Sequence, residues 1–170
     1  GSAMRFVVDP EASVVEIDAR SSLHAIHGQA KGMTGVVELA DGQDGWSIVA
    51  GASRLSVPVE GVTAGNALED SELRRRVEAC RYPEITGLVT AAERGATIGT
   101  LRVTGDLTFH GVTRSVSGDL RISVADGIAQ LSGEHTLDVR DYGVQPPKLL
   151  LIKVDPEVRA MFDKLGISLA

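Results

Sequence analysis

The stretch GDLTFHGVTRSV, residues 105–116, decides the fold of this chain. Leu107 and Phe109 lie two residues apart with polar residues between them, which is the alternation of a half-buried β-strand. His110 and Gly111 then interrupt the alternation, and VTRSV resumes it. Because glycine permits a tight turn, the stretch predicts a hairpin. We expect His110, on the polar face of its strand, to bond to the turn first and to contact a ligand at a pocket mouth only second.

The strands on either side each keep one apolar face. TIGTLRVTGDLTFHG and SVSGDLRISVADG both alternate in this way, and turns such as DG separate the short strands. Such spacing is typical of an antiparallel meander. Closing the meander into a barrel removes its exposed edges, and about eight strands enclose a lumen wide enough for one small ligand. The residues that we expect to line this lumen are Leu101, Val103, Leu107, Phe109, Leu120, Ile122 and Val124.

Two segments have helical rather than strand spacing. In NALEDSELRRRVEACRYP, Asn66 is a plausible N-cap, acidic residues come early and Arg74, Arg75 and Arg76 come late, which suits the helix dipole. Near the C-terminus, PPKLLLIKV predicts a continuous apolar strand. The following DPEVRAMFDKLG has apolar residues at helical spacing, and it predicts a second helix over residues 156–166.

Composition sets limits on the class of protein. The chain has 170 residues, 43% of them apolar, and a net charge of −6 that argues against a nucleic-acid binder. Residues 1–3 resemble a remnant of an expression tag, and residues 4–170 are expected to form a single domain. No apolar run reaches the roughly 20 residues that span a bilayer, so stable membrane insertion is not expected. With Met4 as the native start the protein would be cytoplasmic, whereas a removed signal peptide would place it in the envelope or outside the cell.

No residue pattern indicates catalysis or a cofactor. The chain has no G-x-S-x-G elbow, no P-loop and no dinucleotide fingerprint, so we expect a protein that is not an enzyme and needs no cofactor. His24 and His27 lie three apart, which points them to opposite faces of a strand, and no metal site is expected there. GEHT, residues 133–136, contains the single His135. Cys80 is expected to be a free thiol, because one cysteine cannot form an internal disulfide.

The chain resembles the YceI-like family in several places. VTGDLTFHGVTRSV is similar to the family signature G-x-L-T-x-H-G-V-T-[KR]-x-V, and VVDPEASVVEIDARSS resembles the family's opening strand. CRYPEI and LDVRDYGV resemble two later elements, in the same order along the chain. The resemblance implies a lipocalin-like antiparallel β-barrel with a long apolar lumen. Members of the family are associated with polyisoprenoid lipids, so the resemblance also implies a lipid-binding protein.

Two classes of function remain open at this point. The first is a binding or carrier protein for a long apolar ligand, a polyisoprenoid or a similar lipid, held in the lumen. The second is a non-enzymatic stress-response or interaction module whose barrel is filled by side chains. A helix packed into the lumen would favour the second class. The expected partner is a long-chain apolar small molecule and not a nucleic acid, and pairing with a second copy of the chain is left open.

Overall fold

The computed structural model describes residues 3–21, 25–145, 148–149 and 152–169. Over these residues the chain forms one antiparallel sheet and one α-helix, α1 (Ala67–Arg76). Two short 3-10 helices are η1 (Val59–Gly61) and η2 (Val139–Tyr142). The strands are β1 (Ala3–Val8), β2 (Val15–Ser21), β3 (Ala25–Ala30), β4 (Thr34–Gly42), β5 (Gly45–Ile48), β6 (Arg54–Pro58), β7 (Val62–Thr63), β8 (Glu84–Arg94), β9 (Thr100–Phe109), β10 (Val112–Ala125), β11 (Ile128–Asp138), β12 (Lys148–Leu149) and β13 (Ile152–Leu169).

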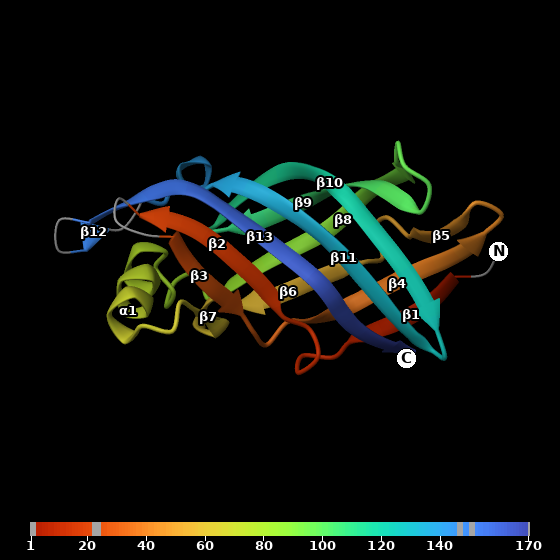
Figure 1. Cartoon of the computed structure of the whole chain (residues 1–170), viewed down its shortest axis with the longest axis horizontal. Helices are drawn as coiled ribbons and strands as arrows, with labels where there is room; N and C mark the ends of the chain where they lie inside the picture. The colour runs from red at the N-terminus through yellow and green to blue at the C-terminus, as the bar shows by residue number, and fades with distance from the viewer. Residues whose placement is uncertain (1–2, 22–24, 146–147, 150–151, 170) are drawn as a thin grey trace.

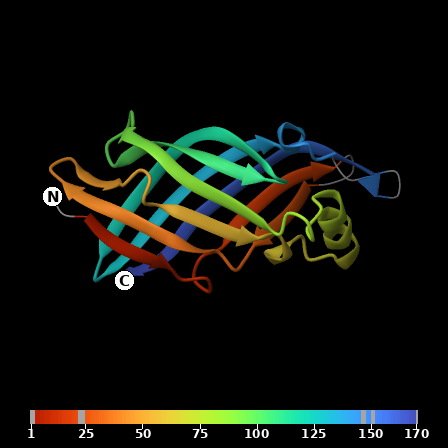
Figure 2. The same cartoon turned by 180° about the vertical axis from the view of Figure 1, so that it is seen from behind.

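Eight of these strands close into a ring, which confirms the predicted antiparallel barrel. The order of hydrogen-bonded neighbours is β1-β4-β6-β8-β9-β10-β11-β13, and β13 pairs back to β1. Figure 1 shows these long strands crossing obliquely, with β1 and the end of β13 at one end and α1 at the other. Figure 2 shows the reverse side, where β4, β6 and β8 (orange, gold and green) run side by side.

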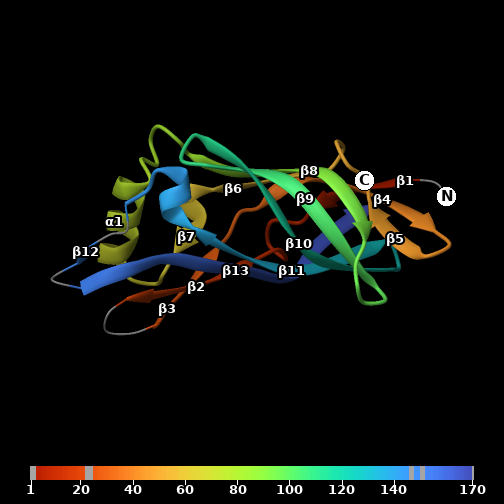
Figure 3. The same cartoon turned by 90° about the horizontal axis from the view of Figure 1, so that it is seen from above.

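At the α1 end the barrel is not closed by the pairing of β13 with β1. Here β13 pairs with β2 instead of β1, and the sheet continues through β3 to β7. η1 connects β3 to β8 through two backbone hydrogen bonds. The Lys31 N–H donates to the Gly61 carbonyl, and the Val59 N–H donates to the Pro83 carbonyl. The first bond joins η1 to the end of β3, and the second joins it to the start of β8. In Figure 3 α1, β7 and β12 gather at this end.

Two-residue turns fix the register of the central strands. His110 and Gly111 join β9 to β10 with φ of 54° and 72°, and Asp126 and Gly127 join β10 to β11 with φ of 55° and 75°. Positive φ at both central residues defines the type I′ turn, whose twist matches that of the flanking strands. The predicted hairpin over residues 105–116 is therefore confirmed, with Phe109 paired to Val112.

The helix predicted after Asn66 is also confirmed. The Asn66 side chain accepts hydrogen bonds from the N–H groups of Leu68 and Glu69, so it acts as the N-cap. Asp70 docks the helix on the sheet, because its carboxylate accepts hydrogen bonds from the Thr63 hydroxyl at 2.5 Å and the Ala64 N–H at 2.7 Å. Among the described residues, no helix is long and apolar enough to cross a bilayer.

The second predicted helix, over residues 156–166, is wrong. These residues belong to the 18-residue strand β13, which pairs with β11 on one side and with β2 and then β1 on the other. Backbone pairing on both sides outweighs the weak local preference for a helix. Pro156, expected at the first helical turn, lies where the β13–β2 register shifts between Val154 and Val158. A proline lacks the N–H that a regular ladder requires, and such irregular places in a sheet tolerate it.

Candidate ligand-binding lumen

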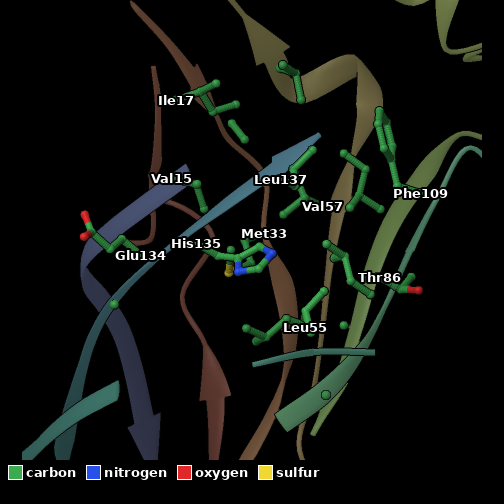
Figure 4. A pocket seen from close by; sticks show the side chains of 18 of the residues that line it. Val15, Ile17, Met33, Leu55, Val57, Thr86, Phe109, Glu134, His135 and Leu137 are labelled. Carbon is green, nitrogen blue, oxygen red and sulfur yellow. The ribbon is translucent and has the colours of Figure 1, made fainter. Parts of the chain in front are cut away.

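The barrel contains an apolar cavity of about 510 Å³. Side chains from β2, β3, β4, β6, β8, β9, β10 and β11 line it, and most of them are aliphatic. Figure 4 shows Ile17, Met33, Val57, Leu137 and Phe109 around this space. Its volume lies within the roughly 300–1,000 Å³ of ordinary small-molecule sites.

The cavity is hollow because inward positions on neighbouring strands carry no side chain. Gly87, Gly105, Gly118 and Gly133 lie on β8, β9, β10 and β11, and all four line the cavity. Gly105 and Gly118 share the strand parity of Val103 and Leu120, which also line it, so they point inward. At Gly87 a Cβ would meet no atom within 4 Å, so the glycine leaves volume open there, whereas at Gly105 a Cβ would lie 2.7 Å from the Leu88 carbonyl oxygen and the glycine allows close approach of β8.

The other end of the barrel is filled. Phe6 and Leu39 are fully buried there, and Met4 and Trp46 pack against the same apolar cluster. This packing explains where the residues expected to line the lumen lie. Four of them line the cavity, namely Val103, Leu107, Phe109 and Leu120. The other three belong to the filled cluster: Leu101 is buried, and Ile122 and Val124 pack against it. Ligand contact by any of the seven stays a prediction.

α1 covers the opposite end of the cavity. Leu73 of α1 and Val77, the C-cap of the helix, belong to an apolar cluster with Phe109, and both line the cavity. Arg74 fastens the helix to η1 by an ion pair of 3.2 Å with Glu60. The expectation that the arginine run is a helix face matched to the dipole agrees with the neighbouring ion pairs: Arg75 and then Arg76 hydrogen-bond Glu72 and hold the pKa of that carboxyl below its ordinary value.

His110 lies in the hairpin turn and connects it to the segments that contain Tyr142 and Glu78. Its Nδ1 lies 2.9 Å from the Tyr142 carbonyl, and its Nε2 lies 2.6 Å from a carboxylate oxygen of Glu78. Both partners offer oxygen atoms to the ring, one from the backbone and one from a carboxylate. The ring also packs edge-on against Tyr82, with centroids 5.1 Å apart. Its side chain is 14% exposed, and it is not among the described residues that line the cavity. These contacts support the structural role expected for His110.

We expect His110→Asn to lower the free energy of unfolding by about 2 kcal/mol, because two hydrogen bonds are lost. Asparagine tolerates the positive φ of this position, so the turn itself is not strained. The melting temperature should fall by about 6 °C in a chain of this size. The control is Asp126→Asn at the equivalent position of the other turn, which should melt like the wild type. Unchanged melting together with a tenfold weaker lipid titration would instead make His110 a ligand contact.

The other expectations from the sequence have different outcomes. His24 lies outside the described residues, so the structure does not test its pairing with His27. His27 lies on β3 and its Nδ1 is 2.7 Å from an oxygen of Asp18 on β2. Within the described residues no cluster of three metal-ligating side chains occurs. Cys80 is an exposed free thiol, as expected.

Analysis of the sequence missed His135 and the four inward glycines. His135 lies on β11 and lines the cavity, between Gly133 and Leu137 on the same face. The signal was present, because the alternation of QLSGEHTLD continues through His135. Leu131, Gly133, His135 and Leu137 share one parity and all four line the cavity, so the polar histidine stands at an inward position of an otherwise apolar face.

A closed antiparallel barrel with an apolar internal cavity and one covering helix defines the fold class of this chain. The sequence matches the YceI-like domain over residues 6–163, and the chain belongs to the YceI-like family. No sequence among the curated proteins matches it.

Solved structures show the same fold at low sequence identity. Burkholderia cenocepacia BcnA is 16% identical, with a TM-score of 0.76 over 96% of this chain and 99% of that one. A polyisoprenoid binding domain from Saccharophagus degradans, implicated in plant cell wall breakdown, is 14% identical, with a TM-score of 0.75 over 98% and 99%. The YceI protein of Campylobacter jejuni is 21% identical, with a TM-score of 0.59 over 69% and 70%.

Proposed function

We propose that this protein binds one long apolar molecule, a polyisoprenoid or a similar lipid, in the barrel lumen and carries it without changing it chemically. The observation that supports this most is the cavity of about 510 Å³ with its aliphatic lining. Membership of the YceI-like family supports it further, since the Saccharophagus degradans domain of the same fold is described as polyisoprenoid binding.

The energetics of association favour a long ligand over a compact one. Burying ten methylene groups gains on the order of 8 kcal/mol, which only offsets the estimated 4–15 kcal/mol lost on association. A chain must therefore be long to bind tightly. The cavity also argues against the alternative of a barrel filled by side chains, and α1 lies at one end of the lumen instead of along it (Figure 1).

The test is organic extraction of freshly purified protein followed by mass spectrometry. We expect one class of long-chain lipid at near-stoichiometric amount, because a buried long chain dissociates slowly. Protein stripped of lipid and incubated with phytol should take up one molecule per chain. An extract without lipid, together with no uptake of phytol, would contradict the proposed function.

A further inference from the structure

One histidine among the described residues lines the cavity, and it is His135. Its strand β11 points Gly133, His135 and Leu137 into the lumen. Figure 4 shows the imidazole directed into the space beside Met33 and Leu55. The next side chain along the chain, Glu134, directs its carboxylate away from that space. A polar ring therefore projects into surroundings that are otherwise aliphatic.

The imidazole of His135 has no hydrogen-bond partner among the described residues. His110, by contrast, binds a partner at each ring nitrogen and holds a turn in place. A polar group shielded from water costs free energy unless it is hydrogen-bonded. A half-buried histidine in an apolar lumen gains most if a bound molecule supplies the missing partner.

Neighbouring glycines leave room for such a partner. Gly118 lies on β10 beside His135, since a Cβ built at Gly118 would lie 3.4 Å from the carbonyl oxygen of Glu134. A Cβ built at Gly87 would meet no atom within 4 Å. Gly118 therefore places no side chain beside the one imidazole of the described lining. A flat or branched group can lie against the ring there without displacing an aliphatic side chain.

The charges around the cavity indicate the chemistry of that group. The charged residues among the described lining are Glu69, Asp70, Arg76, Asp106, Asp119 and Glu134. Asp106, Asp119 and Glu134 lie at strand positions whose side chains face away from the lumen, so they bring no charge into it. The only cation of this set, Arg76, pairs with Glu72 at 2.8 Å. Phosphate and diphosphate groups are held in proteins by free arginine and lysine side chains. Because the described lining offers no unpaired cation, an anionic head group is disfavoured.

We propose that His135 hydrogen-bonds an uncharged polar group of the ligand, a hydroxyl or a carbonyl, inside the lumen. The ligand is then a neutral amphiphile whose apolar chain extends from His135 along the barrel. This inference rests on the proposed function and adds to it the class of head group and the residue that selects it. The selection works because a neutral imidazole both donates and accepts one hydrogen bond.

The experiment compares three probes with the same carbon skeleton: phytol, its hydrocarbon phytane, and phytyl diphosphate. The wild-type protein should bind phytol more tightly than either of the others. His135→Leu should weaken phytol binding about tenfold, the effect of one lost hydrogen bond, and leave phytane binding unchanged or stronger. His135→Gln keeps a donor and an acceptor and should recover part of the loss. The matched control is His27→Leu, since the His27 side chain is 76% exposed on the outside of the barrel.

A second measurement avoids variants altogether. Phytol should shift the imidazole NMR signals of His135 in the wild-type protein, whereas phytane should leave them in place. Equal loss of phytol and phytane binding in His135→Leu, or tightest binding of phytyl diphosphate, would overturn the inference while the lipid-binding function stands. Binding of none of the three probes, with a lipid-free extract, would overturn the proposed function and this inference together.

Discussion

Gly111→Val is expected to be the most destabilising single change in the β9–β10 hairpin, lowering the free energy of unfolding by about 4 kcal/mol. Two effects add here. The φ of Gly111 is 72°, a region that a β-branched residue avoids at a cost of about 1–3 kcal/mol. A Cβ at this position would also lie 2.5 Å from Cε1 of Tyr82, so the ring would have to move. Thermal melting should show a fall of about 12 °C.

The second type I′ turn provides a matched control. Gly127 has a φ of 75°, and a Cβ there meets no atom within 4 Å. Gly127→Val therefore imposes the backbone strain without the collision, and we expect about half the loss. Tyr82→Ala in the Gly111→Val background should remove the collision and recover part of the stability. If both valine variants melt at the same temperature, Tyr82 yields without cost and the collision contributes nothing.

Gly87→Leu is expected to reduce the lipid recovered from the purified protein at least tenfold while the protein stays folded. Gly87 lines the cavity, and a Cβ built there has no neighbour within 4 Å. The leucine side chain can therefore enter the lumen without steric conflict, and it occupies volume that a ligand would need. Filling a cavity with an apolar side chain commonly stabilises a fold by about 0.5–2 kcal/mol, so the melting temperature should hold or rise.

Ala91→Leu on the same strand is the control for Gly87→Leu. Ala91 is exposed and does not line the cavity, so the same added side chain should leave lipid recovery unchanged. Mass spectrometry of extracts and thermal melting are both needed. Full lipid recovery from a well-folded Gly87→Leu variant would show that the ligand does not occupy this part of the lumen.

The sequence predicted those parts of the fold that local signals determine. Asn66 before an acidic turn predicted the cap of α1, and the His110–Gly111 step predicted a two-residue turn. The error over residues 156–166 has a non-local cause. Helical spacing there competes with pairing to β11, β2 and β1, and these partners lie far away in the sequence.

The candidate site was predicted less completely than the fold. Alternation identifies the inward face of a strand, and Val103 and Phe109, which it assigns to that face, line the cavity. It cannot show which inward residues touch a neighbour and which face empty space. That depends on Phe6 and Leu39, which fill one end of the barrel, and on the glycines of four strands that line the cavity at the other end. Both features arise from contacts between residues that lie far apart along the chain, and a local sequence pattern does not contain such contacts.

The pairing of β1 with β13 has a consequence for the order of folding. The hairpins from β9 to β11 join sequence neighbours, and such hairpins form within about 1–10 μs. The seam instead joins Phe6 to Leu169, so it forms only when β13 has been synthesised and has found β1. Contacts between such distant segments slow folding toward the millisecond-to-second range. Until the seam between β1 and β13 pairs, the eight-stranded ring is not closed, so closure of the barrel depends on the two ends of the chain meeting.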